Sequence, residues 1–250
     1  KLEREIQIGL ERNEFFLEYQ PIMSTKTRAL SGYEALIRWQ HPERGRIPPD
    51  KFIGIAEEAG LIAQLGEWVL RQACRDATKW QNHLTVAINV SPLQFTASDL
   101  PELIHKTLVE TGLLPTRLNI EITESTLLNG NHNISILSRL REMGVGIVMD
   151  DFGTGYSSLS YLRDFQFDKV KIDRSFILDM LQNPHAAAIV DAILSLGTGI
   201  GIEIVAEGIE TVEQLCYLEN KNCAMVQGYF IGRPSKTIAK SPSDAALNYT

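Results

Sequence analysis

Residues 117–151 read RLNIEITESTLLNGNHNISILSRLREMGVGIVMDD, and this stretch contains the pattern that decides the fold. An apolar run surrounds Glu121, a helical stretch follows at 131–143, and a second apolar run ends in Asp150 and Asp151. A strand, a helix and a second strand in this order predict a parallel pair of strands, because the helix carries the chain back to the edge of the sheet where the first strand began.

The same alternation extends over most of the 250 residues. Strands are predicted at 15–23, 29–39, 84–90, 117–123, 145–150, 168–173, 202–206 and 224–230, with helices at 2–11, 50–59, 61–80, 98–111, 131–143, 157–164, 184–196 and 211–220. Eight strands, six of them entered from a helix, predict an α/β fold, a TIM-like (β/α)8 barrel. The polar stretch 24–27 leaves no room for a helix between the first two strands, so we expect an antiparallel first strand.

The domain organisation follows from the same pattern. We assign residues 13–236 to the barrel, residues 1–12 to a linker helix or a helix of the domain itself, and residues 237–250, which lack periodicity, to a C-terminal tail. The chain begins at Lys1 with neither an initiator methionine nor a signal pattern, so we interpret it as part of a longer protein with regulatory or sensory domains upstream.

The charge and the cysteines restrict the class of protein. A net charge of −7 argues against binding to a polynucleotide backbone. No apolar stretch approaches the roughly 18 residues that a membrane span needs. The three cysteines lack a C-x-x-C spacing and suit a reducing compartment, so we expect a cytoplasmic location, with any membrane anchor in segments outside this chain.

Every predicted strand after the first delivers a polar residue at or near its carboxyl end. In chain order these residues are Glu34, Asn89, Glu121, Asp150 with Asp151, Lys171 with Asp173, Glu207 and Gln227. The carboxyl ends of barrel strands meet at one rim, which is the catalytic face of this architecture. A single acid at a strand end is often only solvated or caps the next helix, but seven strands in succession favour a functional site.

The charges of these residues predict a metal centre. If they converge, five of the carboxylates carry −5 and Lys171 carries +1; these five are Glu34, Glu121, Asp150, Asp151 and Glu207. Carboxylates brought together repel strongly unless cations compensate them. Two divalent cations would balance the remaining −4. Carboxylate and amide oxygens favour Mg²⁺ or Mn²⁺, and paired hard cations are typical of phosphoryl chemistry, in which Lys171 could orient a water.

The motifs in their order resemble the EAL-domain phosphodiesterases, which hydrolyse cyclic di-GMP in bacterial signalling. The resemblance rests on YQPI at 19–22, EALIRW at 34–39, INVS at 88–91, EITE at 121–124, DDFGTGYSSL at 150–159, KID at 171–173, AEGIE at 206–210 and QGYF at 227–230. It covers nearly the whole chain, and no expected metal, lysine or loop position is substituted.

The resemblance implies a role for each site residue. One metal would be held by Glu34, Asn89, Glu121 and Asp150, and the second by Asp150, Asp151 and Glu207. Lys171 would hold the attacking water, with Glu34, Glu207 and Asp151 also counted as catalytic. Substrate contacts would come from Gln20, Arg38, Asp173 and Gln227, with Arg38 clamping a phosphate. Glu124, Gly153 and Gly155 would support the loop from Asp151 to Leu159.

We therefore expect a homodimeric, metal-dependent enzyme that opens cyclic di-GMP to linear pGpG. The alternative is a catalytically inactive receptor that binds cyclic di-GMP and passes a signal to a partner. A third possibility is another metal-dependent barrel enzyme, such as a lyase that uses Lys171 and Asp173 for proton abstraction.

Overall fold

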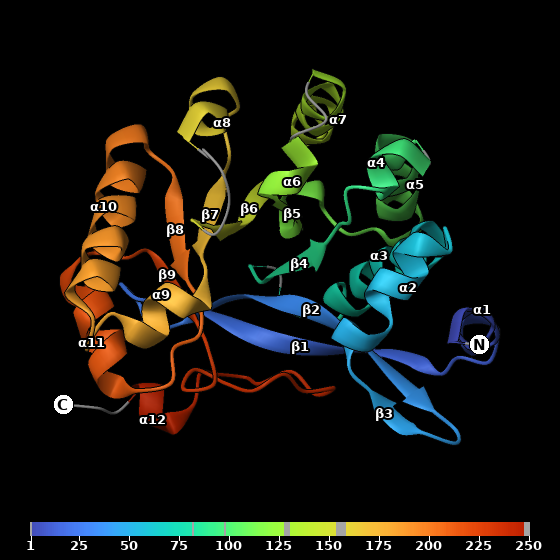
Figure 1. The fold of residues 1–250 in the computed structure, drawn as a ribbon, viewed down its shortest axis with the longest axis horizontal. Helices are drawn as coiled ribbons and strands as arrows, with labels where there is room; N and C mark the ends of the chain where they lie inside the picture. The colour runs from blue at the N-terminus through green and yellow to red at the C-terminus, as the bar shows by residue number, and fades with distance from the viewer. Residues whose placement is uncertain (1, 82, 98, 128–130, 154–158, 248–250) are drawn as a thin grey trace.

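The computed structural model describes residues 2–81, 83–97, 99–127, 131–153 and 159–247 (Figure 1). Its strands are β1 Phe15–Ser24, β2 Leu30–His41, β3 Gly45–Ile47, β4 Thr85–Asn89, β5 Leu118–Thr123, β6 Gly146–Phe152, β7 Lys169–Ile172, β8 Glu203–Ala206 and β9 Met225–Gln227. They form one sheet in the order β1-β9-β8-β7-β6-β5-β4-β2-β3, and β1 also pairs with β2. This additional pairing closes eight strands into a barrel and leaves β3 as an extension of β2.

The helices surround the barrel on its outside (Figure 1). They are α1 Leu2–Glu11, α2 Ile53–Glu58, α3 Ile62–Ala77, α4 Gln94–Ala97, α5 Leu100–Thr111, α6 Glu124–Leu127, α7 Asn131–Glu142, α8 Leu159–Asp164, α9 Arg174–Asp179, α10 Pro184–Ile200, α11 Val212–Asn220 and α12 Asp244–Leu247, with short 3₁₀ turns at Pro49–Lys51 and Pro115–Arg117. No helix in these described ranges is both long and apolar enough to cross a bilayer.

The predicted α/β barrel with an antiparallel first strand is confirmed. β1 runs antiparallel to both β2 and β9, whereas the neighbouring pairs from β2 and β4 through to β8 and β9 are parallel. The apolar runs form these strands because both faces of a parallel barrel sheet are covered, one by the barrel interior and one by helices. In β5, for example, five consecutive residues from Leu118 to Ile122 are buried.

Capping side chains define where several helices begin. Asp99 accepts a hydrogen bond from the Glu102 backbone N–H at the start of α5, and Thr211 forms a reciprocal capping box with Gln214 at the start of α11. α5 ends at Gly112, whose φ of 74° is the left-handed conformation that glycine adopts most readily. These caps fix the points at which each crossover helix turns back to the barrel.

The structure contains elements that the sequence did not predict and shortens one that it did. The hairpin strand β3 was not predicted, and neither were the short helices α4, α6, α9 and α12. The last strand ends at Gln227 instead of continuing to residue 230. A Cβ on Gly228 would lie 2.1 Å from the Ile209 backbone nitrogen, so the chain passes another backbone here and turns instead of extending the strand.

Both ends of the described chain pack onto the barrel. Ile6 of α1 is fully buried in a second apolar cluster that contains Phe15 and Trp39, whose rings stack at 5.1 Å. The segment after residue 237 is not a loose tail in the described residues: Ala246 is buried, and the Ser243 backbone N–H donates to the Ile231 carbonyl at 2.9 Å. This segment runs beneath β1 and β2 in Figure 1.

Gly32 is a position where the pairing of β2 with β4 can be tested. A Cβ on Gly32 of β2 would lie 2.3 Å from Thr85 Oγ1 and 2.5 Å from the Thr85 carbonyl oxygen of β4. We expect Gly32→Ala to lower the free energy of unfolding by about 1–3 kcal/mol, measured by urea denaturation, because the two paired strands must move apart. Gly54→Ala is the matched control, since a Cβ there meets nothing within 4 Å and should leave stability equal or slightly raised. Equal effects of the two substitutions would contradict this account.

Candidate active site

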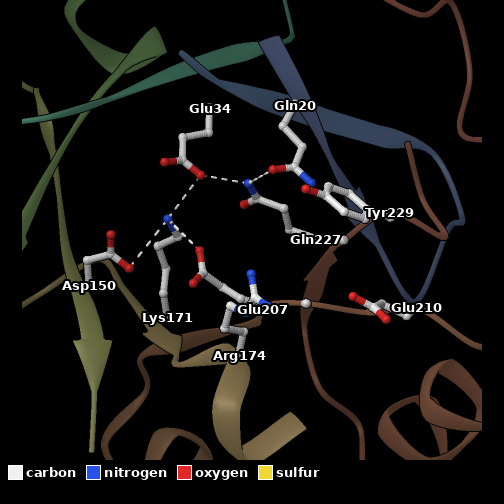
Figure 2. Close-up of a pocket in the computed structure, with 11 residues that line it drawn as sticks. Gln20, Glu34, Asp150, Lys171, Arg174, Glu207, Glu210, Gln227 and Tyr229 are labelled. Atoms are coloured by element: carbon white, nitrogen blue, oxygen red, sulfur yellow. Dashed lines mark hydrogen bonds and ion pairs between the residues drawn. The ribbon is translucent and has the colours of Figure 1, made fainter. Parts of the chain in front are cut away.

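A single ammonium group lies at the centre of the acidic rim. Lys171 is 1% exposed, and its Nζ lies 2.7 Å from Glu207 Oε1, 2.9 Å from Glu121 Oε2, 3.3 Å from Glu34 Oε2 and 3.4 Å from Asp150 Oδ1. The five side chains come from β7, β5, β2, β6 and the residue after β8. Figure 2 shows three of these carboxylates around the ammonium. Segments far apart in the sequence therefore meet at one charged centre.

The alternation along each strand explains how these polar groups reach the barrel interior. In β7, Val170 and Ile172 pack into the apolar core with the surrounding helices, which turns Lys171 to the opposite face. Ile120 and Ile122 flank Glu121 of β5 in the same way. A charged residue between two apolar ones is thus the local pattern of an inward-facing site residue.

Side-chain amides hold Glu34 in place. Gln227 Nε2 donates to Glu34 Oε2 at 2.6 Å and to Gln20 Oε1 at 3.2 Å, and Asn89 Nδ2 donates to Glu34 Oε1 at 2.7 Å. Gln227 Oε1 is buried and has no hydrogen-bond partner among the described residues. A buried acceptor oxygen without a donor suits a cation or a water molecule.

Two ionisable groups of the centre are stabilised in their charged forms. Burial alone would raise the pKa of Glu34, but the charge of Lys171 and the hydrogen bonds from Gln227 and Asn89 outweigh it and hold this pKa below its usual range. Burial alone would lower the pKa of Lys171, but the surrounding carboxylates, Glu121 foremost, raise it well above the ordinary value.

The other carboxylates are not fully compensated by one lysine. Burial, reinforced by Asp150 and Glu34 against the opposing charge of Lys171, raises the pKa of Glu207 to about 8. Burial likewise raises the pKa of Glu121 well above its ordinary value, because the attraction of Lys171 does not offset it. Without further cations the site therefore retains protons near neutral pH, and divalent metal ions would displace them.

A bulge places two consecutive aspartates at the same rim. The pairing of β6 with β7 shifts register between Met149 and Phe152, and Asp151 has a left-handed φ of 53°. In a regular strand, neighbouring side chains point to opposite faces, so this irregularity is what lets both Asp150 and Asp151 face the site. Carboxylate oxygens of Asp150, Asp151 and Glu207 lie within 4.8 Å of one another, a spacing at which one cation can be shared.

The structure brings together most of the predicted site residues. The group that meets at the rim consists of Gln20, Glu34, Asn89, Glu121, Asp150, Asp151, Lys171, Glu207 and Gln227. Two predicted substrate contacts have other partners. Arg38 Nε donates to Glu18 Oε2 at 3.0 Å, and Asp173 caps α9 by accepting the Ser175 backbone N–H.

The predicted loop support is described in part. Glu124 Oε1 accepts a hydrogen bond from the Gly153 backbone N–H at 3.4 Å, so the two residues are in contact. Gly153 has a φ of 99°, which a residue with a side chain rarely adopts. Gly155 lies outside the described residues. The role of this contact in holding the loop that follows remains a prediction.

Two cavities open at the site. One of about 230 Å³ is lined by Glu34, Lys171, Glu207 and Gln227, together with Arg174, Glu210 and Tyr229, which the sequence did not single out (Figure 2). A second, more apolar cavity of about 510 Å³ shares Asn89 and Glu121 with the charged centre and has Arg38, Ile53 and Val69 in its wall. Arg174 and Tyr229 each lie within three residues of a predicted strand-end residue. This position in the sequence could have identified them as candidate site residues.

A comparison with known proteins assigns the family. The EAL domain model matches residues 3–234. This chain belongs to the EAL domain family. The resemblance inferred from the motifs is therefore confirmed, and the rim around Lys171 is the polar centre of an EAL domain.

Relatives of this EAL domain include proteins of known and unknown activity. It is 48% identical over 250 residues to an uncharacterized signaling protein of Caulobacter vibrioides, covering 100% of this chain and 30% of that protein. It is 42% identical over 239 residues to the bifunctional diguanylate cyclase/cyclic di-GMP phosphodiesterase MucR of Pseudomonas aeruginosa, covering 94% of this chain and 35% of MucR. The chain thus spans about a third of the length of these relatives.

A solved structure agrees with this assignment. The PaMucR phosphodiesterase in complex with c-di-GMP superposes on this EAL domain with a TM-score of 0.89 at 42% sequence identity, covering 93% of this chain and 96% of that chain. The barrel and its connections are therefore shared over nearly the full length of both chains.

The carboxylate pKa values predict how the metal-free domain responds to pH. Because the pKa of Glu207 rises from 4.5 to about 8 on folding, the folded state binds more protons than the unfolded state between these values. The stability that this proton provides is present below about pH 4.5 and is lost as the pH rises through about 8. We expect the thermal midpoint, measured in chelator, to fall by several degrees between about pH 5.5 and 8.5.

Glu207→Gln is the control for this measurement. The amide cannot titrate, so it should flatten the decrease with pH without abolishing the contribution of Glu121. A thermal midpoint of the wild-type domain that rises over the same range would show that the acidic rim is already neutralised without metal.

Proposed function

We propose that this domain is a metal-dependent phosphodiesterase that hydrolyses cyclic di-GMP to linear pGpG. The observation that carries the proposal is the convergence of four carboxylates from separate barrel segments on Lys171 Nζ, all within 3.4 Å. The relatives support the choice of substrate, since MucR is named a cyclic di-GMP phosphodiesterase and its solved domain is a c-di-GMP complex.

The residues of the rim fit two divalent cations. Glu34, Asn89, Glu121 and Asp150 would hold one, and Asp150, Asp151 and Glu207 the other. Three observations support this assignment: the 4.8 Å carboxylate cluster, the raised pKa values of Glu121 and Glu207, and the unpartnered Gln227 Oε1. Such cations supply Lewis acidity that activates a water and neutralises charge on the transferring phosphoryl group.

The protein groups of the site would orient the reactants. Lys171 Nζ is buried between the carboxylates and can donate a hydrogen bond to a water or a phosphate oxygen that lies among them. Gln227 and Asn89 hold Glu34 through both of its oxygens, which fixes the direction in which this carboxylate presents its lone pairs. In the reaction, the water oxygen forms a bond to phosphorus, the bond from phosphorus to the ribose O3′ breaks, and O3′ leaves with a proton.

The shape of the site suits a cyclic dinucleotide. Residues of the charged centre line both the polar cavity and the larger apolar cavity, so we propose that one phosphate lies at the rim while a base enters the apolar side. Arg38 in the wall of the apolar cavity would contact the second phosphate. The domain carries −7 overall, and we propose that the metals and this arginine attract the anionic substrate.

The direct test is hydrolysis by the purified domain. Cyclic di-GMP is incubated with Mg²⁺, Mn²⁺, Ca²⁺ or chelator, and the products are separated by ion-exchange chromatography. We expect pGpG to accumulate with Mg²⁺ or Mn²⁺ and to be absent with chelator. A nucleotide that binds but stays intact with every metal would favour the receptor alternative.

Substitutions in the rim test the assigned roles. Glu34→Ala, Asp150→Ala and Lys171→Ala should each lower kcat by about 100-fold or more, because each removes a charged group from the reacting centre. Glu203→Ala is the matched control: this acid lies at the start of β8, at the opposite end of the barrel, and is exposed. Circular dichroism verifies that each variant remains folded, and a folded variant with a near-normal rate would refute the role of that residue.

The assembly and the location are also proposals. The family resemblance leads us to propose a homodimer, which sedimentation of the purified domain would test. We further propose that regulatory domains accompany this one in its full-length protein and that the domain itself works in the cytoplasm.

A further inference from the structure

A buried carboxylate lies between two arginines beside the larger cavity. Glu18 of β1 is 7% exposed, and its Oε2 accepts a hydrogen bond from Arg38 Nε at 3.0 Å and another from Arg46 Nη2. The Arg38 side chain is mostly buried, whereas that of Arg46 is half exposed. Neither Glu18 nor Arg46 lines either cavity of the site, whereas Arg38 does, so Arg38 connects Glu18 to the cavity wall.

The strand register explains why these three residues meet. Glu18 is paired with Leu36 across β1 and β2, and Arg38 is two positions further along the same face of β2, within diagonal reach. The hairpin strand β3 pairs Arg46 with Gln40 of β2, which brings a second arginine to this face. Arg46, the more exposed arginine of the cluster, thus comes from β3, which extends the sheet beyond the barrel.

Arg38 is held at two of its nitrogen atoms. Glu18 accepts from Nε, and the Ile37 carbonyl accepts from Nη1 at 3.0 Å. An arginine has five N–H donors, so three of them have no protein acceptor among the described residues and remain for a ligand. Arg38 lines the cavity that also contains Asn89 and Glu121, so a ligand in this cavity lies beside the Arg38 side chain.

We propose that Glu18 is a positioning residue: it fixes the Arg38 guanidinium so that its free N–H groups face the second phosphate of the substrate. This inference rests on the proposed function. A long arginine side chain loses rotamer freedom when it binds a phosphate, and a guanidinium that is already anchored loses less of it. Anchoring should therefore act on substrate binding and leave the chemical step nearly unchanged.

Arg46 compensates the negative charge that Glu18 brings to Arg38. A lone carboxylate on Arg38 would cancel its charge and weaken its attraction for phosphate. With Arg46 on the same Glu18 oxygen, the three groups together carry +1. Lys236 adds a further positive charge nearby, since its Nζ lies 3.6 Å from the centre of the Phe16 ring and the Arg46 guanidinium lies 5.8 Å from the same ring.

The test compares the variants Glu18→Ala, Glu18→Gln, Arg38→Ala and the double variant Glu18→Ala/Arg38→Ala. For each, KM and kcat are measured with cyclic di-GMP, and Kd is measured by calorimetry in Ca²⁺. We expect Glu18→Ala to raise KM and Kd by about 10-fold with kcat within about 2-fold. Glu18→Gln keeps an acceptor for Arg38 Nε and should bind within about 3-fold of the wild type.

The double variant isolates the action through Arg38. If Glu18 only positions that arginine, Glu18→Ala should have no further effect on Kd once Arg38 is absent. Glu67→Ala is the control, because Glu67 accepts from Arg71 Nε at 2.9 Å in a comparable ion pair that lines neither cavity. It should leave Kd and KM unchanged.

The outcomes separate this inference from the proposed function. Equal losses in Glu18→Ala and Glu18→Gln, additive losses in the double variant, or an effect on kcat alone would overturn the positioning role. If Glu18→Ala fails to fold, the Kd of Glu18→Gln and a double-mutant cycle made with Gln decide by the same criteria. A wild-type domain that binds but does not hydrolyse cyclic di-GMP refutes the proposed reaction only, whereas one that binds none refutes both.

Discussion

The site depends on one buried ammonium group among four carboxylates. Lys171 has almost no solvent exposure, and its charge is the only positive one within ion-pair distance of Glu34, Glu121, Asp150 and Glu207 among the described residues. Against the effect of burial, Lys171 and the hydrogen bonds from Gln227 and Asn89 hold the pKa of Glu34 below its usual range, but burial leaves the pKa values of Glu121 and Glu207 raised. The protein therefore folds around an excess of negative charge, and this excess supports the proposal that the rim binds divalent cations.

The barrel strands hold these charged side chains in fixed positions relative to one another. Parallel strands all present their carboxyl ends at one rim, and the inward residues of each strand are set by alternation with apolar neighbours. Two departures from regular structure complete the centre. The antiparallel β1 lets Gln20 reach Gln227, and the bulge in β6 turns both Asp150 and Asp151 toward the site. Regular strands alone would have placed one of these aspartates against the outer helices.

The proposed substrate-binding surface extends beyond the charged centre along β2. Glu34 and Arg38 are four positions apart on the same face of this strand, so the charged centre and the arginine are connected through one strand. The pairing of β1 with β2 and of β2 with β3 then brings Glu18 and Arg46 to Arg38. In this way, the pairing of β3 with β2 contributes to the orientation of the Arg38 side chain in the wall of the apolar cavity.

The sequence by itself determined the barrel, the antiparallel first strand and the residues of the rim, because strand alternation and the polar ends of strands are local patterns. Tyr229 and Arg174 were missed, since only the order of the strands in the sheet, with β8 between β7 and β9, brings the ends of β7 and β9 to one cavity. The packed segment after residue 237 and the strand β3 were missed as well, because neither has a local periodicity. Only the tertiary structure decided that Arg38 is held by Glu18, because these residues lie on different strands and become neighbours only when β1 pairs with β2.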